Sequence, residues 1–243
     1  MRQGKHAGRT SVGLARFRRM PFTEVMTTFA GLILAGGRSS RMGTPKALAV
    51  LDGATLVERT AAVLAPQVEH LAVSLPPDID VPSLALPVLR DEAPTFEGPL
   101  AGVLAGLRWA AALPVRPTHL LTAPVDLPFL PADLAARLAE AIDDTDAAIV
   151  AEGPNGRAPL CALWPLAAEP RLAGFLMAGQ RRVLTFLTGA PLRTVAFPPV
   201  IVGGRAVDPF LNVNAPDDFA AAAEATAADR PWSSRRAESG SAQ

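Results

Sequence analysis

The sequence predicts an α/β fold, organised as a single doubly wound, mostly parallel sheet. Short apolar runs alternate along the chain with segments of helical periodicity, which is typical of layered α/β proteins. The run at residues 31–35 (GLILA) is apolar throughout, as expected for a strand that helices cover on both faces. No internal repeat or linker interrupts residues 29–228, so one sheet is the simplest arrangement.

The remaining elements follow in order from the same patterns. Further strands are expected at residues 70–75 (HLAVSL), 84–89, 119–123 (HLLTA), 147–150 (AAIV), 160–164 and 193–197. Helices are expected at residues 55–64, 100–112, 132–142, 166–177, 183–187 and 215–227. Gly98-Pro99 opens the second of these helices with proline near its first turn. Asn214 and the acidic residues after it provide a cap for the last helix.

The composition excludes several classes of function. The 243 residues include 23 basic and 23 acidic side chains, and this balance gives no general attraction to nucleic acid or to an anionic membrane. A single cysteine, Cys161, excludes an intramolecular disulfide framework, a Cys-rich zinc site and an iron–sulfur cluster. With 10 Phe, 3 Trp and no Tyr, the chain has few aromatic platforms for stacking bases. We therefore expect no nucleic-acid partner.

We expect residues 29–228 to form the folded domain, with different segments at either end. Residues 1–28 begin with a basic stretch that lacks the apolar core of a secretory signal. They are expected to be a disordered or over-extended segment; a transit-type or nucleic-acid-binding arm is the alternative. Residues 229–243 are expected to be a polar tail. No apolar run approaches the roughly 18–20 residues that cross a bilayer, so we expect no membrane association and a cytoplasmic location.

The first candidate site is the loop that follows the strand at residues 31–35. In open α/β sheets ligands bind beyond the carboxyl ends of the strands. Residues 34–46 (LAGGRSSRMGTPK) combine glycines, which let the backbone approach phosphate oxygens, with cationic Arg41 and Lys46. The loop matches neither the dinucleotide fingerprint nor a Walker loop. From composition alone, a solvated turn explains it about as well.

Asp126 is the second candidate, because it follows a predicted strand directly and stands between Pro124 and Pro128. A carboxylate held this way is a rigid hard ligand, suited to Mg²⁺ bridging phosphates. A turn or helix-capping aspartate is the alternative.

Asp91 likewise follows a strand and precedes Gly98, where the helix start could present N–H groups to a ligand or serve only as a cap.

The last candidate is the segment FLNVNAP, in which Asn212 and Asn214 are two residues apart. In an extended segment this spacing places both side chains on one side, where they could hold a ligand. As turn residues they would need no function.

Taken together and in this order, these stretches resemble the molybdenum cofactor guanylyltransferases, members of the Rossmann-like nucleotidyltransferase superfamily. The matching motifs are LAGGRSSRMGTPK, an aspartate followed by GPLAG, PVDLPFLP and FLNVNAPDD. The resemblance covers nearly all of residues 31–227. The first loop and the P-x-D-x-P segment are shared by many nucleotidyltransferases, whereas GPLAG combined with FLNVN narrows the match.

The resemblance implies an Mg²⁺-dependent enzyme that transfers GMP from GTP to the terminal phosphate of molybdopterin cofactor and releases pyrophosphate. The nucleotide contacts it implies are Leu34, Ala35, Gly36, Lys46, Asp91 and Asp126. The catalytic residues it implies are Lys46, Asp126 and Arg41, with Asp126 also the metal ligand. The residues it implies for the second substrate are Gly98, Pro99 and Asn214. Partners would be GTP, the molybdopterin cofactor, and cofactor-accepting molybdoenzymes or their chaperones.

Three other functions stay open at this point. The same chemistry could use CTP, or an acceptor such as a sugar phosphate or a phospho-acid. A catalytically silent protein that binds nucleotide and delivers cofactor is an alternative of another class, although the joint presence of Lys46, Asp91 and Asp126 argues against a degenerate site. A dehydrogenase-like Rossmann protein is disfavoured by the glycine spacing and by the basic residues of the first loop.

Overall fold

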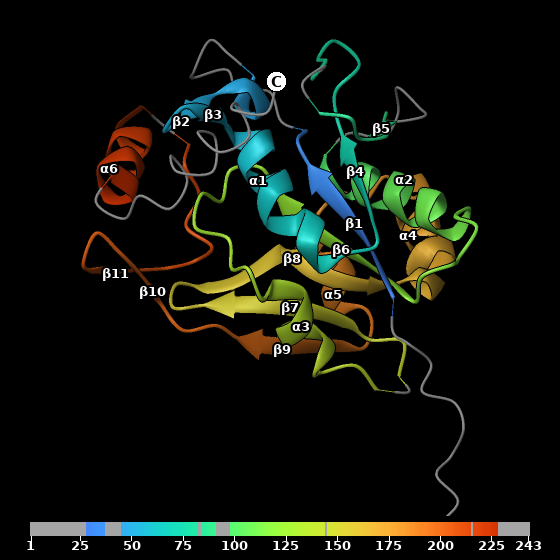
Figure 1. Ribbon diagram of the computed structural model, residues 1–243. Coiled ribbons are helices and arrows are strands. Elements are labelled where there is room, and N and C mark those ends of the chain that lie inside the picture. The colour runs from blue at the N-terminus through green and yellow to red at the C-terminus, as the bar shows by residue number, and fades with distance from the viewer. Residues whose placement is uncertain are drawn as a thin grey trace, which may run out of the picture.

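The computed structural model describes residues 28–36, 45–81, 84–90, 98–143, 145–214 and 216–227, and its centre is a sheet of seven strands (Figure 1). In chain order they are β1 (Phe29–Leu34), β4 (His70–Ser74), β5 (Val88–Leu89), β6 (His119–Pro124), β7 (Ala148–Gly153), β8 (Gly156–Pro165) and β9 (Leu192–Ala196). All six apolar runs predicted after the first lie in these strands, although β5 is shorter than residues 84–89 and β8 longer than residues 160–164.

The strand order is β5-β4-β1-β6-β8-β7-β9. β1 lies between β4 and β6 and pairs parallel with both, and β7 pairs parallel with β9. β8 runs antiparallel to β7, because a tight turn joins the two strands directly as a hairpin. On its other side β8 pairs antiparallel with β6. The sheet is therefore mostly parallel, as predicted, with one antiparallel strand inserted beside β6.

Helices cover both faces of this sheet. They are α1 (Leu56–Leu64), α2 (Pro99–Ala111), α3 (Leu134–Ala139), α4 (Glu169–Met177), α5 (Val183–Thr188) and α6 (Pro216–Ala227), with 3-10 turns η1 (Lys46–Leu48), η2 (Ala65–Gln67) and η3 (Leu166–Ala168). One core contains buried residues of α1 and α3, and the other contains those of α2, α4 and α5. All the predicted helices are present; α3 is shorter than residues 132–142, and the segment at residues 166–177 begins as η3.

Alternate residues of β1 enter the two cores, since successive side chains of a strand point to opposite faces. Ile33 belongs to the core with α1, and Leu32 to the core with α2. Helix α2 packs closely on the sheet through Gly106, where a Cβ atom would lie 2.6 Å from the Leu32 side chain and 2.8 Å from that of Leu120. The Ala- and Gly-rich sequence of α2 thus allows a short distance between helix and strand.

Two small hairpins were not predicted. β2 (Val50–Leu51) and β3 (Ala54–Thr55) are joined by Asp52-Gly53, whose φ angles are 51° and 79°. β10 (Val200–Val202) and β11 (Arg205–Val207) are joined by Gly203-Gly204, also with positive φ. The Asp-Gly and Gly-Gly dipeptides between apolar residues were the available signal.

No helix in the described part of the chain is both long and apolar enough to cross a bilayer. The predicted boundaries of the folded domain, at residues 29 and 228, stay a prediction.

Candidate active site

Three of the predicted site residues, from three distant parts of the sequence, meet beyond the carboxyl end of β6. Lys46 Nζ donates one hydrogen bond to Asp126 Oδ2 at 2.8 Å and another to Asn214 Oδ1. The side chains of Lys46 and Asp126 are only 19% and 17% exposed, so water screens this ion pair incompletely. A partly shielded pair interacts more strongly than one on an open surface.

Lys46 is held by the short turn η1, just before the β2–β3 hairpin. The next residue, Ala47, is fully buried, and the N–H groups of Leu48 and Ala49 donate to the carbonyls of Pro45 and Lys46. The backbone is therefore fixed to the core, and the long side chain alone reaches the site.

Asp126 owes its position to the end of β6. The Val125 N–H donates to the Leu34 carbonyl at 3.1 Å, and the flanking side chains of Val125 and Leu127 are each only 4% exposed. The carboxylate is thus held at the sheet edge between two buried anchors. Its second oxygen, Oδ1, is buried and accepts no hydrogen bond from any described residue. A buried oxygen without a donor is costly, and it is suited to receive a cation.

Asn214 is connected to Asp126 through the backbone as well as through Lys46. The N–H of the preceding residue, Val213, donates to the main-chain carbonyl of Asp126 at 2.9 Å. The Asn214 N–H donates to Asp218 Oδ2 at 2.8 Å, on the first turn of α6. Asn212 and Asn214 line the same cavity, in agreement with the spacing that predicted a shared side.

The predicted nucleotide residues after β1 differ in exposure. Leu34 and Ala35 are 5% and 3% exposed, and the Ala35 N–H donates to the Ser74 carbonyl within the sheet. Gly36 is exposed, and a Cβ atom built there would meet no described atom within 4 Å. Of the three residues, only Gly36 is open to a ligand on its side-chain face.

The other predicted site residues are at the start of α2 or outside the described part of the chain. Gly98 caps α2 with a φ angle of +97°, which favours glycine, and Pro99 is the first residue of the helix. Both are exposed, and neither is among the described residues that line the cavity beside Asn214. Arg41 and Asp91 lie outside the described residues.

A cavity of about 460 Å³ adjoins the Lys46–Asp126–Asn214 group, within the usual range for small-molecule sites. It is formed where the β7–β8 hairpin, the end of β6 and residues 208–214 come together. Its lining residues are Pro124, Leu127, Asn155, Gly156, Arg157, Ala158, Pro159, Leu160, Cys161, Asp208, Phe210, Leu211, Asn212 and Asn214. Among these, Arg157 carries the one cationic side chain. It has a long contact with Glu152, at 4.0 Å.

Cys161 is part of the cavity wall but is only 1% exposed. Burial, and to a smaller degree the negative charge of Asp126, raise the pKa of the Cys161 thiol well above its ordinary value. The thiol therefore stays protonated at neutral pH and is a poor nucleophile. The arrangement favours direct transfer between two bound substrates over transfer through the cysteine.

The sequence did not identify the walls of the cavity contributed by Asn155, Arg157 and Asp208. Pro154-Asn155-Gly156 is a turn composition between two apolar runs, and it was the signal for a hairpin that would place these residues near the sheet edge. Asp208 gave no comparable signal, because it stands two residues before the FLNVNAP segment and outside that motif.

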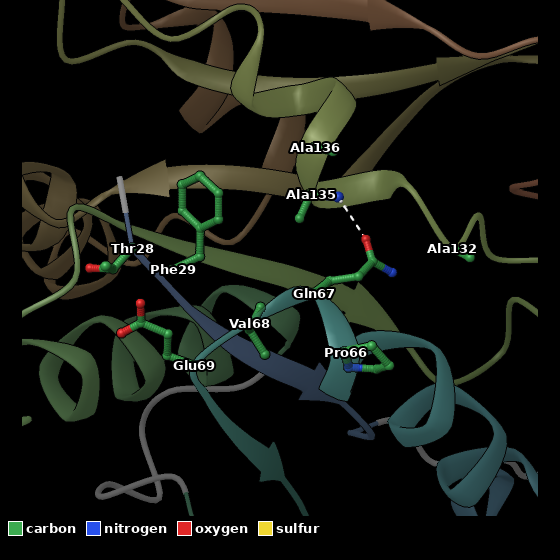
Figure 2. Close-up of a pocket in the computed structure, with 9 residues that line it drawn as sticks. All are labelled: Thr28, Phe29, Pro66, Gln67, Val68, Glu69, Ala132, Ala135 and Ala136. Carbon is green, nitrogen blue, oxygen red and sulfur yellow. Dashed lines mark hydrogen bonds between the residues drawn. The ribbon is translucent and has the colours of Figure 1, made fainter. Parts of the chain in front are cut away.

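A second pocket, of about 510 Å³, lies at the opposite end of β1 (Figure 2). Thr28 and Phe29 line it together with η2 and the first turns of α3. The side chain of Gln67 crosses one side of it and accepts a hydrogen bond from the Ala135 N–H at 2.8 Å. It lies at the amino end of the parallel strands and contains none of the predicted site residues.

A doubly wound sheet with a lysine, a carboxylate and an amide converging at its carboxyl edge suits an α/β enzyme that binds a phosphorylated substrate. The family model described as MobA-like NTP transferase domain matches residues 31–193. This chain belongs to that family and is a nucleotidyltransferase.

Curated relatives support the same placement. A protein named molybdenum cofactor guanylyltransferase from Cereibacter sphaeroides is 49% identical over 194 residues, which are 79% of this chain and 94% of that protein. One of the same name from Sinorhizobium fredii is 42% identical over 196 residues, which are 79% of this chain and 89% of that protein.

Solved structures share the fold at lower identity. Molybdopterin-guanine dinucleotide biosynthesis protein A from Archaeoglobus fulgidus has a TM-score of 0.62 at 20% identity, covering 80% of this chain and 97% of that one. The 2-C-methyl-D-erythritol 4-phosphate cytidylyltransferase from Thermus thermophilus has a TM-score of 0.59 at 21% identity, covering 82% and 99%. The fold is therefore that of nucleotidyltransferases.

Proposed function

We propose that this chain is a molybdenum cofactor guanylyltransferase, which transfers GMP from GTP to the terminal phosphate of molybdopterin cofactor and releases pyrophosphate. The observation that carries the proposal is the meeting of Lys46, Asp126 and Asn214 beside a cavity of small-molecule size. The names of relatives 42% and 49% identical to this chain support the choice of GTP and of this acceptor.

On the nucleotide side, the proposed contacts are Leu34, Ala35, Gly36, Lys46, Asp91 and Asp126. Because Leu34 and Ala35 are buried, we expect the exposed Gly36 to provide the closest backbone approach to GTP. Lys46 would exchange its bonds to Asp126 and Asn214 for bonds to the nucleotide phosphates. Arg41 is proposed, by resemblance, to add a second positive charge there.

On the acceptor side, the proposal assigns the cavity beside Asn214 to the molybdopterin cofactor, with Gly98 and Pro99 as further contacts. Asn214 lies both at the cavity and at the Lys46–Asp126 pair, so it stands where the two substrates must meet. Arg157 supplies a guanidinium group, which suits a phosphate because of its planar set of donors.

Asp126 and Asn214 fit the requirements of Mg²⁺. Both offer hard oxygen ligands, and Asp126 Oδ1 is buried without a donor among the described residues. Mg²⁺ typically uses one or two carboxylates and takes its other ligands from phosphates and water, so the absence of a larger acidic or His/Cys cluster within the described ranges is no obstacle. When bound, the ion would act as a Lewis acid toward the phosphates.

The reaction requires positioning and charge neutralisation more than covalent participation of the protein. An oxygen of the acceptor phosphate forms a bond to the α-phosphorus of GTP, while the bond from that phosphorus to the β-bridging oxygen breaks and pyrophosphate leaves. Lys46 would stabilise the negative charge that develops on the phosphates. Asp126 and Asn214 would orient the reacting groups at the sheet edge.

We propose a cytoplasmic location for this reaction. The product would then pass to molybdoenzymes, or to their chaperones, that use a guanine dinucleotide form of the cofactor.

The test is pyrophosphate release by the purified protein with Mg²⁺, comparing GTP with CTP, each with and without molybdopterin cofactor. Release with GTP only when cofactor is present supports the proposal. An Asp126→Asn protein purified identically controls for contaminating activity. Release with CTP in place of GTP would assign the cytidylyl reaction instead. Binding of cofactor without release from either nucleotide would favour the adaptor function.

A further inference from the structure

Asp208 is a buried carboxylate that joins two separate walls of the cavity. It is 9% exposed. Its Oδ2 accepts a hydrogen bond from the Asn155 N–H at 2.8 Å, in the turn of the β7–β8 hairpin. Its Oδ1 accepts one from the Phe210 N–H, also at 2.8 Å, in its own loop. Each oxygen of the carboxylate is thus engaged with the backbone, on different sides of the cavity.

The contact with the hairpin is close enough to exclude a side chain at Gly153. A Cβ atom built there would overlap Asp208 Oδ1 and lie 2.9 Å from the carboxylate carbon, and its three nearest atoms all belong to Asp208. The φ angle of Gly153 is not in the left-handed region. At this position glycine is required by the proximity of the carboxylate rather than by backbone conformation.

The loop that Asp208 holds leads directly to Asn214. The Leu211 N–H donates to the Asp208 carbonyl at 3.1 Å, which closes a turn, and the Val213 N–H then donates to the Asp126 carbonyl. The backbone of residues 208–214 is therefore fixed at one end by the Asp208 carboxylate and at the other by Asp126. Asn212 and Asn214, which line the cavity, lie on this fixed segment.

We propose that Asp208 is a positioning residue for the acceptor side of the reaction: its carboxylate fixes residues 208–214 against the β7–β8 turn and so places Asn212 and Asn214 for the acceptor. The inference rests on the proposed function. Each oxygen of Asp208 accepts a backbone N–H donor, and the proposed role acts through these two bonds. Removal of the Asp208 carboxylate should weaken binding of the acceptor and leave binding of GTP unchanged.

The kinetic test compares Asp208→Ala and Asp208→Asn with the wild type. Asp208→Ala should raise the KM for molybdopterin cofactor at least about tenfold, while the KM for GTP stays within about twofold. Asp208→Asn keeps one acceptor oxygen, so its KM for molybdopterin cofactor should lie between those of the wild type and Asp208→Ala. The control is Thr60→Val, which removes another buried hydrogen bond, from Thr60 Oγ1 to the Leu56 carbonyl in α1, and should change neither KM. Equal rises in both KM values, or no rise, would overturn the inference.

Gly153→Ala provides an independent test through the other partner. In the wild-type background the new methyl group displaces the carboxylate, so the KM for the acceptor should rise. In the Asp208→Ala background there is no carboxylate to displace, so the same substitution should change this KM less than about twofold. Effects that multiply in the double variant would show that the two residues act separately, which contradicts the proposal.

Amide hydrogen exchange tests the positioning role of Asp208 independently of catalytic activity. The amides of Phe210 and Val213 should exchange at least about tenfold faster in Asp208→Ala than in the wild type, with those of β1 and β6 unchanged. Unchanged exchange at both amides would overturn the inference. If the wild-type protein releases no pyrophosphate from GTP, the proposed function is contradicted. If the wild type is active and the Asp208 variants have wild-type KM values and exchange rates, only this inference is contradicted.

Discussion

The Lys46 ammonium group lies 2.8 Å from Asp126 Oδ2 and also bonds to Asn214 Oδ1. One monovalent cation therefore bridges the two oxygen groups that we propose for Mg²⁺. A divalent ion at the same oxygens would have to displace Lys46 Nζ or share Asp126 with it. Release of Lys46 from this pair would make the lysine available to the phosphates at the step at which the metal takes its place.

The first prediction is that Lys46→Met strengthens metal binding in the absence of nucleotide. Removing the competing ammonium group should lower the Kd for Mn²⁺ about fivefold, because a partly shielded ion pair contributes about 1 kcal/mol. Lys46→Arg retains the charge and is the matched control. Titration calorimetry or the paramagnetic resonance of free Mn²⁺ measures both. Equal or weaker Mn²⁺ binding by Lys46→Met would show that the lysine does not occupy the metal position.

The second prediction concerns Asp126→Asn, which keeps the shape of the side chain and removes its charge. If Asp126 acts mainly in the transition state, kcat should fall at least about 100-fold while GTP affinity changes only a few-fold. Asp133→Asn, an exposed acid at the start of α3, is the control for loss of one negative charge. Near-wild-type kcat in Asp126→Asn would remove this residue from the proposed chemistry.

Local patterns predicted the layers of the fold, but not every strand direction. The apolar runs at residues 31–35 and 119–123 lie in β1 and β6. A short run that is apolar throughout is typical of a strand covered on both faces, so these two strands were predictable. The run at residues 160–164 gave no direction, since the direction of β8 depends on the two-residue turn before Gly156. Pairing between strands is a long-range property, and periodicity along one segment does not encode it.

The candidate site was predictable where a residue stands at the end of a strand. Asp126 was found this way, whereas Lys46 was found as a cation at the end of the glycine-rich loop after β1, and the structure brings their side chains together. Asp208 was missed because its role depends on contacts with Asn155 and Gly153, more than fifty positions away. Their hairpin was itself not predicted, although Pro154-Asn155-Gly156 has a turn composition, and nothing in the sequence pairs that turn with Asp208.

The third prediction tests the close packing of α2 on the sheet. Gly106→Ala should destabilise the fold by about 1–3 kcal/mol, because the new methyl group would press on Leu32 and Leu120, and this outweighs the helix-propensity gain of about 1 kcal/mol. Gly174→Ala is the control: it lies inside α4, with no atom within 4 Å of the added Cβ, and should stabilise by about 0.5–1 kcal/mol. Urea unfolding measures both. Shifts of the same sign would contradict the packing argument.

The fourth prediction is a pH dependence of stability that originates at His119, at the amino end of β6. Burial of the ring, which packs edge-on against Phe29, lowers the pKa of His119 below 6.5, and the smaller effect of Asp146 opposes this. The unfolded chain therefore binds a proton at higher pH than the folded chain does. Stability should fall as the pH drops through about 6.5 toward the lower pKa of the folded state, and this contribution should be complete above pH 6.5.

His119→Gln isolates that contribution, because glutamine retains a polar side chain that does not titrate. The free energy of unfolding, measured in urea at several pH values between about 7.5 and 5, should depend less steeply on pH in the variant than in the wild type. The difference must have this sign, since the unfolded state gains the proton at a higher pH than the folded state does. Parallel pH profiles for the two proteins would mean that His119 binds protons equally in both states, and a steeper profile for the variant would mean that the native environment favours the charged ring.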